Sequence, residues 1–165
     1  MLSLASIFCY CIAIMKYVIL SDVRSRHNVG AIFRTCEGAG VSMLYLAGYT
    51  PHPIDRFGRE VGEIKKTSLG ASLMVPWAAA DDIELLILKL KSQGVTVVAV
   101  EQTPQSVSLF EHTEPKEVAY VFGNEITGVL PEVVALCDYA LEIPMHGRKE
   151  SLNVSVTTGI ILFQK

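Results

Sequence analysis

Short, continuous apolar runs recur along this chain and alternate with stretches of helical periodicity. The clearest runs are residues 17–20, 95–100 and 118–122, which are rich in β-branched and aromatic side chains. A strand that is apolar on both sides must be covered on both faces, which is typical of parallel sheets in α/β proteins. The alternation therefore predicts one α/β domain with a mainly parallel sheet flanked by helices.

The expected elements follow one another along the chain. We expect strands at residues 17–20, 42–47, 73–75, 95–100, 118–122 and 140–143. Helices are expected from an N-cap at Asn28 to Gly38 or Gly40, and over residues 81–91, 131–136 and about 153–163. Residues 50–69 contain two prolines and two glycines and are expected to form a long irregular loop, which in a compact domain is commonly functional.

The length of the chain sets the number of domains. At 165 residues it is long enough for one well-packed domain and too short for two ordinary ones. Half of the residues are hydrophobic and only 19% are charged, so a large core can be buried and disorder is not expected. We assign residues 15–165 to this domain.

Residues 1–14 are an apolar N-terminal extension whose status the residues leave open. The segment lacks the positive n-region and the clear cleavage site of a signal peptide, and with Lys16 after it the apolar run is short for a membrane span. Met15 opens cleanly into the first expected strand. We therefore favour Met15 as the natural start over a membrane anchor, and we do not expect membrane association.

The net charge of −3 alone argues against nucleic-acid binding, because phosphate contacts need positive charge. The distribution of the charges weakens that objection. Nine of the fourteen Lys and Arg residues lie in or beside the loops considered below: Arg24, Arg26, Arg34, Arg56, Arg59, Lys65, Lys66, Arg148 and Lys149. Acidic residues gather elsewhere, as at 81–84 and 111–117. A mildly acidic protein with one basic face is compatible with this pattern.

The four cysteines, Cys9, Cys11, Cys36 and Cys137, match neither a paired zinc motif nor a small disulfide framework. We interpret them as buried, reduced thiols of a cytoplasmic protein. The four histidines are scattered, and no metal-ligand cluster stands out in the sequence. We expect no metal.

Three segments combine an apolar run with a polar, glycine-bearing loop. Residues 121–128 and 143–155 each run from an expected strand into such a loop, which leaves backbone amides and carbonyls free to grip a ligand at a strand's carboxyl end. Residues 22–35 place several cations just before the start of a helix, which is a good phosphate site.

Each of these segments also has a purely structural interpretation. Asn28 can cap a helix that merely carries Arg34 on its surface, Gly123 can serve a turn, and Ser151 can cap the last helix. The three segments in this order carry more weight than any one of them. Together they resemble the signature motifs of the SpoU (TrmH-like) RNA ribose 2′-O-methyltransferases, in the SPOUT class of S-adenosylmethionine enzymes.

The resemblance covers the chain from about Met15 to its C-terminus and implies roles for individual residues. The implied catalytic positions are Arg34, Asn28, Glu125, Ser151 and Asn153. The implied cofactor positions are Val100, Gly123, Ile143, Ser151 and Leu152, which would hold S-adenosyl-L-methionine partly through the backbone. The nine cations named above, apart from Arg34, are the expected RNA-binding residues. Arg34 would hold a phosphate and orient the hydroxyl, because a guanidinium resists deprotonation, and Glu125 is the rival base.

The resemblance further implies a deep C-terminal trefoil knot and a homodimer whose active site draws on both subunits. The expected activity is methyl transfer to a ribose 2′-hydroxyl, with tRNA favoured over rRNA because no separate RNA-binding domain stands out. A noncatalytic RNA-binding member of the same fold and a small-molecule methyltransferase are the alternatives. The filled polar positions weigh against the first alternative, and the basic stretch over residues 56–66 weighs against the second.

Overall fold

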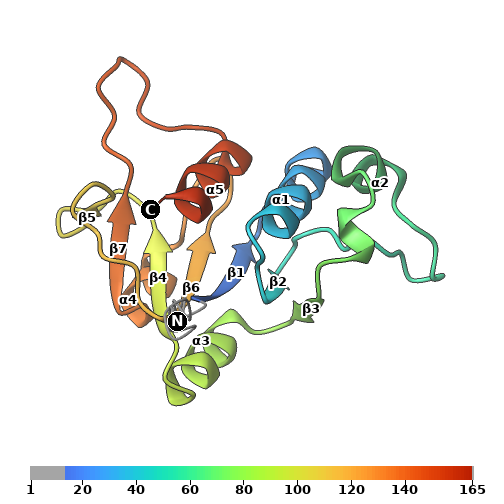
Figure 1. The fold of residues 1–165 in the computed structure, drawn as a ribbon, viewed down its shortest axis with the longest axis horizontal. Coiled ribbons are helices and arrows are strands. Elements are labelled where there is room, and N and C mark those ends of the chain that lie inside the picture. Colours follow the sequence, from blue (N-terminus) through green and yellow to red (C-terminus); the bar gives the residue numbers. More distant parts are fainter. Residues whose placement is uncertain (1–13, 165) are drawn as a thin grey trace, which may run out of the picture.

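The computed structural model describes residues 14–164, which form one seven-stranded sheet with helices on both faces (Figure 1). The strands are β1 (Met15–Ser21), β2 (Met43–Ala47), β3 (Trp77–Ala80), β4 (Thr96–Val100), β5 (Val107–Ser108), β6 (Glu117–Phe122) and β7 (Tyr139–Glu142). Their order across the sheet is β3-β2-β1-β6-β4-β7-β5, and neighbouring strands pair in parallel. The predicted α/β class with a mainly parallel sheet is confirmed.

The centre of the sheet consists of the strands that the apolar runs predict. β1 pairs with β2 on one side and with β6 on the other, so it lies in the interior of the sheet. Val18 and Leu20 enter one hydrophobic core, and Ile19 between them enters the core on the opposite face. This alternation explains why β1 needs apolar residues at successive positions.

Two layers of helices cover the sheet. The layer on one face contains α1 (Arg26–Gly38), α2 (Gly62–Ser68) and α5 (Val154–Phe163). The layer on the other face contains α3 (Ile83–Ser92) and α4 (Pro131–Leu136). Because every strand runs in the same direction, the loops that leave the carboxyl ends of β1, β4, β6 and β7 gather at one edge of the sheet.

The start of α1 differs from the sequence expectation, and the start of α5, which lies where it was expected, excludes Ser151 as its cap. Helix α1 is capped by Ser25, whose hydroxyl accepts a hydrogen bond from the Asn28 amide, so Asn28 lies inside the first turn and is not the N-cap. Helix α5 is capped by Asn153, whose side chain accepts from the Ser155 amide, and Ser151 lies ahead of the cap. Asn28 is thereby left free to use its side chain for contacts outside the helix.

The segment between β2 and β4 also corrects the expectation. The stretch 50–69 contains helix α2, and the strand expected at 73–75 is wrong. Residues Ala71–Leu73 form a short 3-10 helix, and β3 follows at Trp77–Ala80. The apolar side chains of Leu73 and Met74 turn to solvent instead of entering the sheet. The short edge strand β5 was not expected.

Some sequence expectations fall on residues that the structure leaves undescribed. Residues 1–13, with Cys9 and Cys11, lie outside the described part of the chain. Within residues 14–164, no helix has both the length and the apolar character needed to cross a membrane. Cys36 is a buried free thiol, as predicted, whereas Cys137 is only partly buried. Burial raises the pKa of Cys36 to about 12 and that of Cys137 to about 11.

Helices α1 and α2 approach each other closely at Gly30. A Cβ placed there would collide with the Thr67 hydroxyl and lie 2.7 Å from the Ile64 carbonyl oxygen. Backbone therefore packs against backbone at this crossing, and only a residue without a side chain fits.

We expect Gly30→Ala to lower the free energy of unfolding by about 1–3 kcal/mol, because the added methyl group forces the two helices apart. Gly38→Ala in the same helix is the matched control. Its Cβ would meet only Phe163 Cζ at 3.5 Å, so its stability should be unchanged or raised by up to about 1 kcal/mol. Urea unfolding followed by circular dichroism measures both, and equal stability of the two variants would contradict the tight crossing.

Candidate active site

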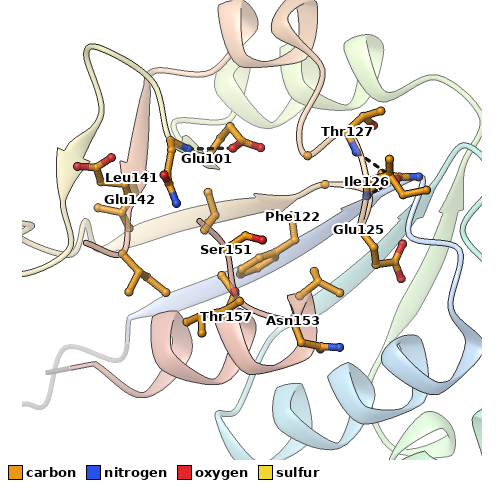
Figure 2. Close-up of a pocket in the computed structure, with 18 of the residues that line it drawn as sticks. Glu101, Phe122, Glu125, Ile126, Thr127, Leu141, Glu142, Ser151, Asn153 and Thr157 are labelled. Atoms are coloured by element: carbon orange, nitrogen blue, oxygen red, sulfur yellow. Dashed lines mark hydrogen bonds between the residues drawn. The ribbon is translucent and has the colours of Figure 1, made fainter. Parts of the chain in front are cut away.

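A cavity of about 360 Å³ opens at the carboxyl edge of the sheet, where the loops after β4, β6 and β7 meet the segment that leads into α5 (Figure 2). Its apolar walls come from the strand ends and the α5 segment, and include Val100, Phe122, Leu141, Ile143 and Leu152. Polar groups of the loops line the remainder. A concave site with apolar walls and a few convergent polar groups is typical of small-molecule binding.

The wall formed by the β6 loop depends on a glycine. Gly123 follows β6 directly, and a Cβ at this position would collide with the backbone of Gly128 and Val129. The loop closes on itself through two backbone hydrogen bonds between Asn124 and Gly128, with N···O distances of 3.0 and 2.9 Å. Residues 123–128 therefore form a compact turn whose free edge faces the cavity.

Asn124 ties this turn to the end of β1. Its side-chain amide donates to the Asp22 carbonyl at 2.9 Å, and its side-chain oxygen accepts from the Ile126 amide at 2.8 Å. Asp22 has a φ of 56°, a left-handed backbone conformation that residues other than glycine adopt rarely. The contact from Asn124 helps hold this unfavourable bend, which directs the chain from β1 toward α1.

Glu125 holds the segment that begins α1. Its carboxylate accepts hydrogen bonds from the Arg24 amide at 3.1 Å, the Ser25 amide at 3.1 Å and the Asn28 side-chain amide at 2.9 Å. Partial burial by itself raises the pKa of Glu125, but the hydrogen bonds from the Asn28 side chain and from the amides of Arg24 and Ser25 outweigh it. The pKa of Glu125 therefore lies below its usual value, and the group is a stable carboxylate.

The same set of contacts reaches the third loop. The Asn153 side-chain amide donates to Asn28 Oδ1 at 3.2 Å, while Asn153 Oδ1 accepts from the Ser155 amide and hydroxyl at 2.8 and 2.7 Å. A continuous series of side chains, Glu125 to Asn28 to Asn153, thus connects the three segments that stand out in the sequence. In the sequence, Glu125 and Asn28 are 97 positions apart, and Asn28 and Asn153 are 125 positions apart.

The sequence residues expected to contact a cofactor gather around the cavity. Val100, Gly123, Ile143, Ser151 and Leu152 all line it. Of the expected catalytic residues, Glu125, Ser151 and Asn153 also line it, and Asn28 reaches it through its contacts with Glu125 and Asn153. Their chemical roles stay predictions.

Arg34 lies apart from this group. It is exposed, about two turns beyond Asn28 on α1, and it does not belong to the cavity lining. Positions 29, 32, 33 and 36 of the helix face the core, so Arg34 projects from the opposite, outer side. Within residues 14–164, its guanidinium forms no salt bridge.

Two polar residues after β4 were missed by the sequence analysis. The Glu101 carboxylate accepts from the Val129 amide at 2.8 Å and from the Gln102 amide at 2.9 Å, which joins the β4 and β6 loops. The Gln102 side chain donates to the Glu150 carbonyl at 2.7 Å and holds the loop after β7. Both residues follow the carboxyl end of a strand, and this position could have identified them, because it is also what makes Glu125 a candidate after β6.

The expected RNA-binding cations divide into two groups. Arg26, Arg59 and Lys65 are within ion-pair distance of Glu63, Asp55 and Glu60 respectively. The others are exposed and have no ion pair with a described residue: Arg24, Arg56, Lys66, Arg148 and Lys149. The positive charge available to a partner is therefore smaller than the sequence count suggests. In the described part of the chain, no three His, Cys, Asp or Glu side chains are arranged to hold a metal ion.

Known proteins are similar to this chain in sequence and in fold. A model of the SpoU rRNA Methylase family matches residues 15–163. Over 147 residues the chain is 36% identical to a tRNA (guanosine(18)-2′-O)-methyltransferase of Aquifex aeolicus, which covers 89% of this chain and 66% of that protein. It is 33% identical over 147 residues to the 23S rRNA (guanosine-2′-O-)-methyltransferase RlmB of Xanthomonas axonopodis, covering 89% of this chain and 56% of that protein.

A solved structure agrees with these relationships. The AdoMet-bound rRNA methyltransferase from Sinorhizobium meliloti superposes with a TM-score of 0.79 at 34% identity, over 90% of this chain and 54% of that one. The chain thus spans between about half and two thirds of the length of these three relatives.

The hydrogen bonds to Glu125 predict a pH-dependent contribution to stability. Because the pKa of Glu125 is lower in the folded protein than its ordinary value of 4.5, the carboxylate stabilises the fold fully above that value. The contribution is lost as the pH falls through the lowered pKa. We expect Glu125→Gln to be less stable than the wild type at pH 6 to 7, and the difference to shrink toward pH 3. Urea midpoints across this range measure it, and a constant difference would contradict the assignment.

Proposed function

The chain belongs to the SpoU rRNA Methylase family, and we propose that it is an enzyme that transfers a methyl group from S-adenosyl-L-methionine to a ribose 2′-hydroxyl of RNA. The observation that carries this proposal is the Glu125–Asn28–Asn153 series of hydrogen bonds, which assembles all three motif loops around one cavity. A methyl-transfer assay with tritiated cofactor and cellular RNA tests it.

The cavity suits the proposed cofactor. Apolar side chains of Val100, Ile143 and Leu152 can enclose an adenine ring, and backbone groups of the β6 and β7 loops are free to bind its polar edge. The cofactor supplies an electrophilic methyl group on a positively charged sulfur. Glu101, Glu125 and Glu142 line the same cavity and make its field favourable to a cation.

The reaction joins the ribose oxygen to the methyl carbon, breaks the sulfur–methyl bond and releases the hydroxyl proton. A ribose hydroxyl is a weak nucleophile near neutral pH, so the site must align it closely with the methyl group. We assign Arg34 to binding the target phosphate and orienting the hydroxyl, because a guanidinium does not give up its proton. Ser151 and Asn153 fix the ribose side of the cavity through neutral hydrogen bonds.

Glu125 is assigned to positioning and not to proton transfer. Its two oxygens already accept three hydrogen bonds, and its pKa is lowered, so it has little tendency to take a proton near neutral pH. This favours an RNA phosphate, held by Arg34, as the group that assists proton loss.

We favour tRNA over rRNA as the substrate, since the tRNA-modifying relative from Aquifex is the more similar of the two relatives compared. Mapping 2′-O-methylated nucleotides in RNA from cells without the gene identifies the target. The second candidate function is RNA binding without catalysis. Calorimetry with S-adenosylmethionine and with RNA separates the two, because a noncatalytic member binds only RNA.

The proposal includes a homodimer, the trefoil knot of the family and a cytoplasmic location, with residues 15–165 as the methyltransferase domain and 1–14 as an extension. Helix α5 supports the dimer, because Val156, Ile160 and Phe163 lie on one side of it and are 50%, 38% and 59% exposed. The free thiols of Cys36 and Cys137 support a reducing compartment.

Arg34→Ala should reduce methyl transfer by at least about 100-fold while leaving the affinity for S-adenosylmethionine unchanged, because Arg34 does not line the cavity. Transfer assays and calorimetry measure the two quantities. Glu37→Ala, an exposed position one turn further along the same helix, is the control and should behave like the wild type. Wild-type turnover of the Arg34→Ala enzyme would remove Arg34 from the mechanism.

Mixed dimers test whether Arg34 serves the partner's cavity. Arg34→Ala disables the arginine, and Gly123→Trp fills the cavity wall, so each variant alone should be inactive. Random pairing makes about half of all dimers mixed, and each mixed dimer has one complete site, so activity should recover to at most about a quarter of wild type. No recovery, although mixed dimers form and both chains fold, would show that Arg34 acts within its own subunit.

A further inference from the structure

The loop between β2 and α2 contains a small, well-organised turn at residues 54–60, which projects beyond α2 at one side of the molecule (Figure 1). Ile54 and Glu60 pair as an antiparallel bridge at its base. Asp55 organises its interior: one carboxylate oxygen accepts from the amides of Phe57 and Arg59 at 2.8 and 3.0 Å, and the other accepts from Arg59 Nε at 2.9 Å. These bonds lower the pKa of Asp55, the amide of Arg59 having the largest effect.

The turn presents to solvent an aromatic ring that has two arginines over it. Phe57 is 66% exposed although the turn around it is held by several hydrogen bonds. The guanidinium carbons of Arg56 and Arg59 lie 4.8 and 5.0 Å from the centre of its ring. The tip therefore combines a largely exposed aromatic ring with two guanidinium groups that lie over it, an arrangement that serves neither the hydrophobic core nor the cavity described above.

We propose that Phe57 is a stacking platform for an unpaired base of the RNA substrate, with Arg56 and Arg59 contacting the phosphates beside that base. Aromatic side chains next to cations are the usual means of binding single-stranded nucleic acid, since every base has a π face and every nucleotide a charge. The inference rests on the proposed function, because it takes RNA as the partner.

The charges around the turn favour RNA over an apolar protein surface. Arg56 has no ion pair with a described residue, and Lys66 on the following helix is exposed and equally unpaired there. Arg59 is held over the ring by Asp55 at 2.8 Å, whereas the unpaired Arg56 can leave its place over the ring to a base and turn to the adjoining phosphate. An apolar partner would have to strip water from these cations, whereas a nucleotide phosphate would pair with them.

A double-stranded RNA is a poorer fit than an unpaired segment. The bases of an A-form duplex are stacked on one another, and its deep major groove does not admit side chains. A ring at the tip of a projecting turn cannot enter the stack of a continuous duplex, whereas it can stack on an unpaired base, as in a loop or a bulge. The platform thus selects RNA in which an unpaired nucleotide lies at a set distance from the methylated ribose.

Phe57→Ala should weaken binding of a single-stranded oligoribonucleotide by about 5- to 150-fold, the range for loss of one base stack, and should leave the affinity for S-adenosylmethionine unchanged. Phe57→Trp should bind at least as well as wild type, and Phe57→Leu, which keeps the apolar bulk without the π face, should be as weak as Phe57→Ala. Phe110→Ala is the matched control, because Phe110 is 76% exposed and follows β5 at the opposite edge of the sheet.

Fluorescence anisotropy of the labelled oligonucleotide, alone and annealed to its complement, provides the affinities. The loss caused by Phe57→Ala should be confined to the single strand and should not alter the salt dependence of binding. Arg56→Ala should reduce the slope of log K against log salt by about 0.7, the value for one phosphate contact on a single strand. Equal losses on single and double strands, full affinity of Phe57→Leu, or wild-type affinity of Phe57→Ala would each overturn the inference. Failure of the wild-type protein to bind either RNA would instead overturn the proposed function.

Discussion

The Glu125 carboxylate makes the contacts on which the arrangement of the site depends. It binds the amides of Arg24 and Ser25 and the side chain of Asn28, and so it joins the loop after β6 to the start of α1. Asn28 in turn contacts Asn153. A hydrogen bond to a charged acceptor is roughly twice as strong as one between neutral groups, and its geometry is more closely defined. Through this carboxylate and Asn28, three loops that are distant in sequence share one set of hydrogen bonds.

The parallel sheet makes these contacts possible. The loops that follow the strands all lie at one edge of the sheet. Short side chains there can form hydrogen bonds to residues that are 97 and 125 positions away in the sequence. The packing needed there is tight: Gly123 leaves no room for a Cβ, and Asp22 adopts a left-handed bend that Asn124 supports. Unfavourable backbone conformations of this kind persist where the surrounding structure over-determines them, which is common at functional sites.

Much of this could be predicted from local sequence. Strands β1, β4 and β6 were found because strands buried on both faces need uninterrupted apolar residues. The same criterion wrongly predicts a strand at residues 73–75. Three apolar residues are too few to show a periodicity, and two of them, Leu73 and Met74, turn to solvent. The cap of α1 was misplaced because Ser25 and Asn28 are both good N-caps, and the choice between them depends on a contact from Asn28 to Glu125 across the fold. Long-range contacts of this kind leave no local signal.

The close crossing of α1 and α2 at Gly30 links the surface that carries Arg34 to the turn that carries Phe57. Helix α1 carries Arg34, and helix α2 directly follows the turn that presents Phe57. Because the two helices pack backbone to backbone, they have little freedom to slide against each other, and the two surfaces belong to one rigid unit. Under the two proposals made above for Arg34 and Phe57, this crossing sets the distance between the two RNA contacts. An RNA would then be recognised by the separation in space between an unpaired base and the target ribose as much as by the identity of its nucleotides.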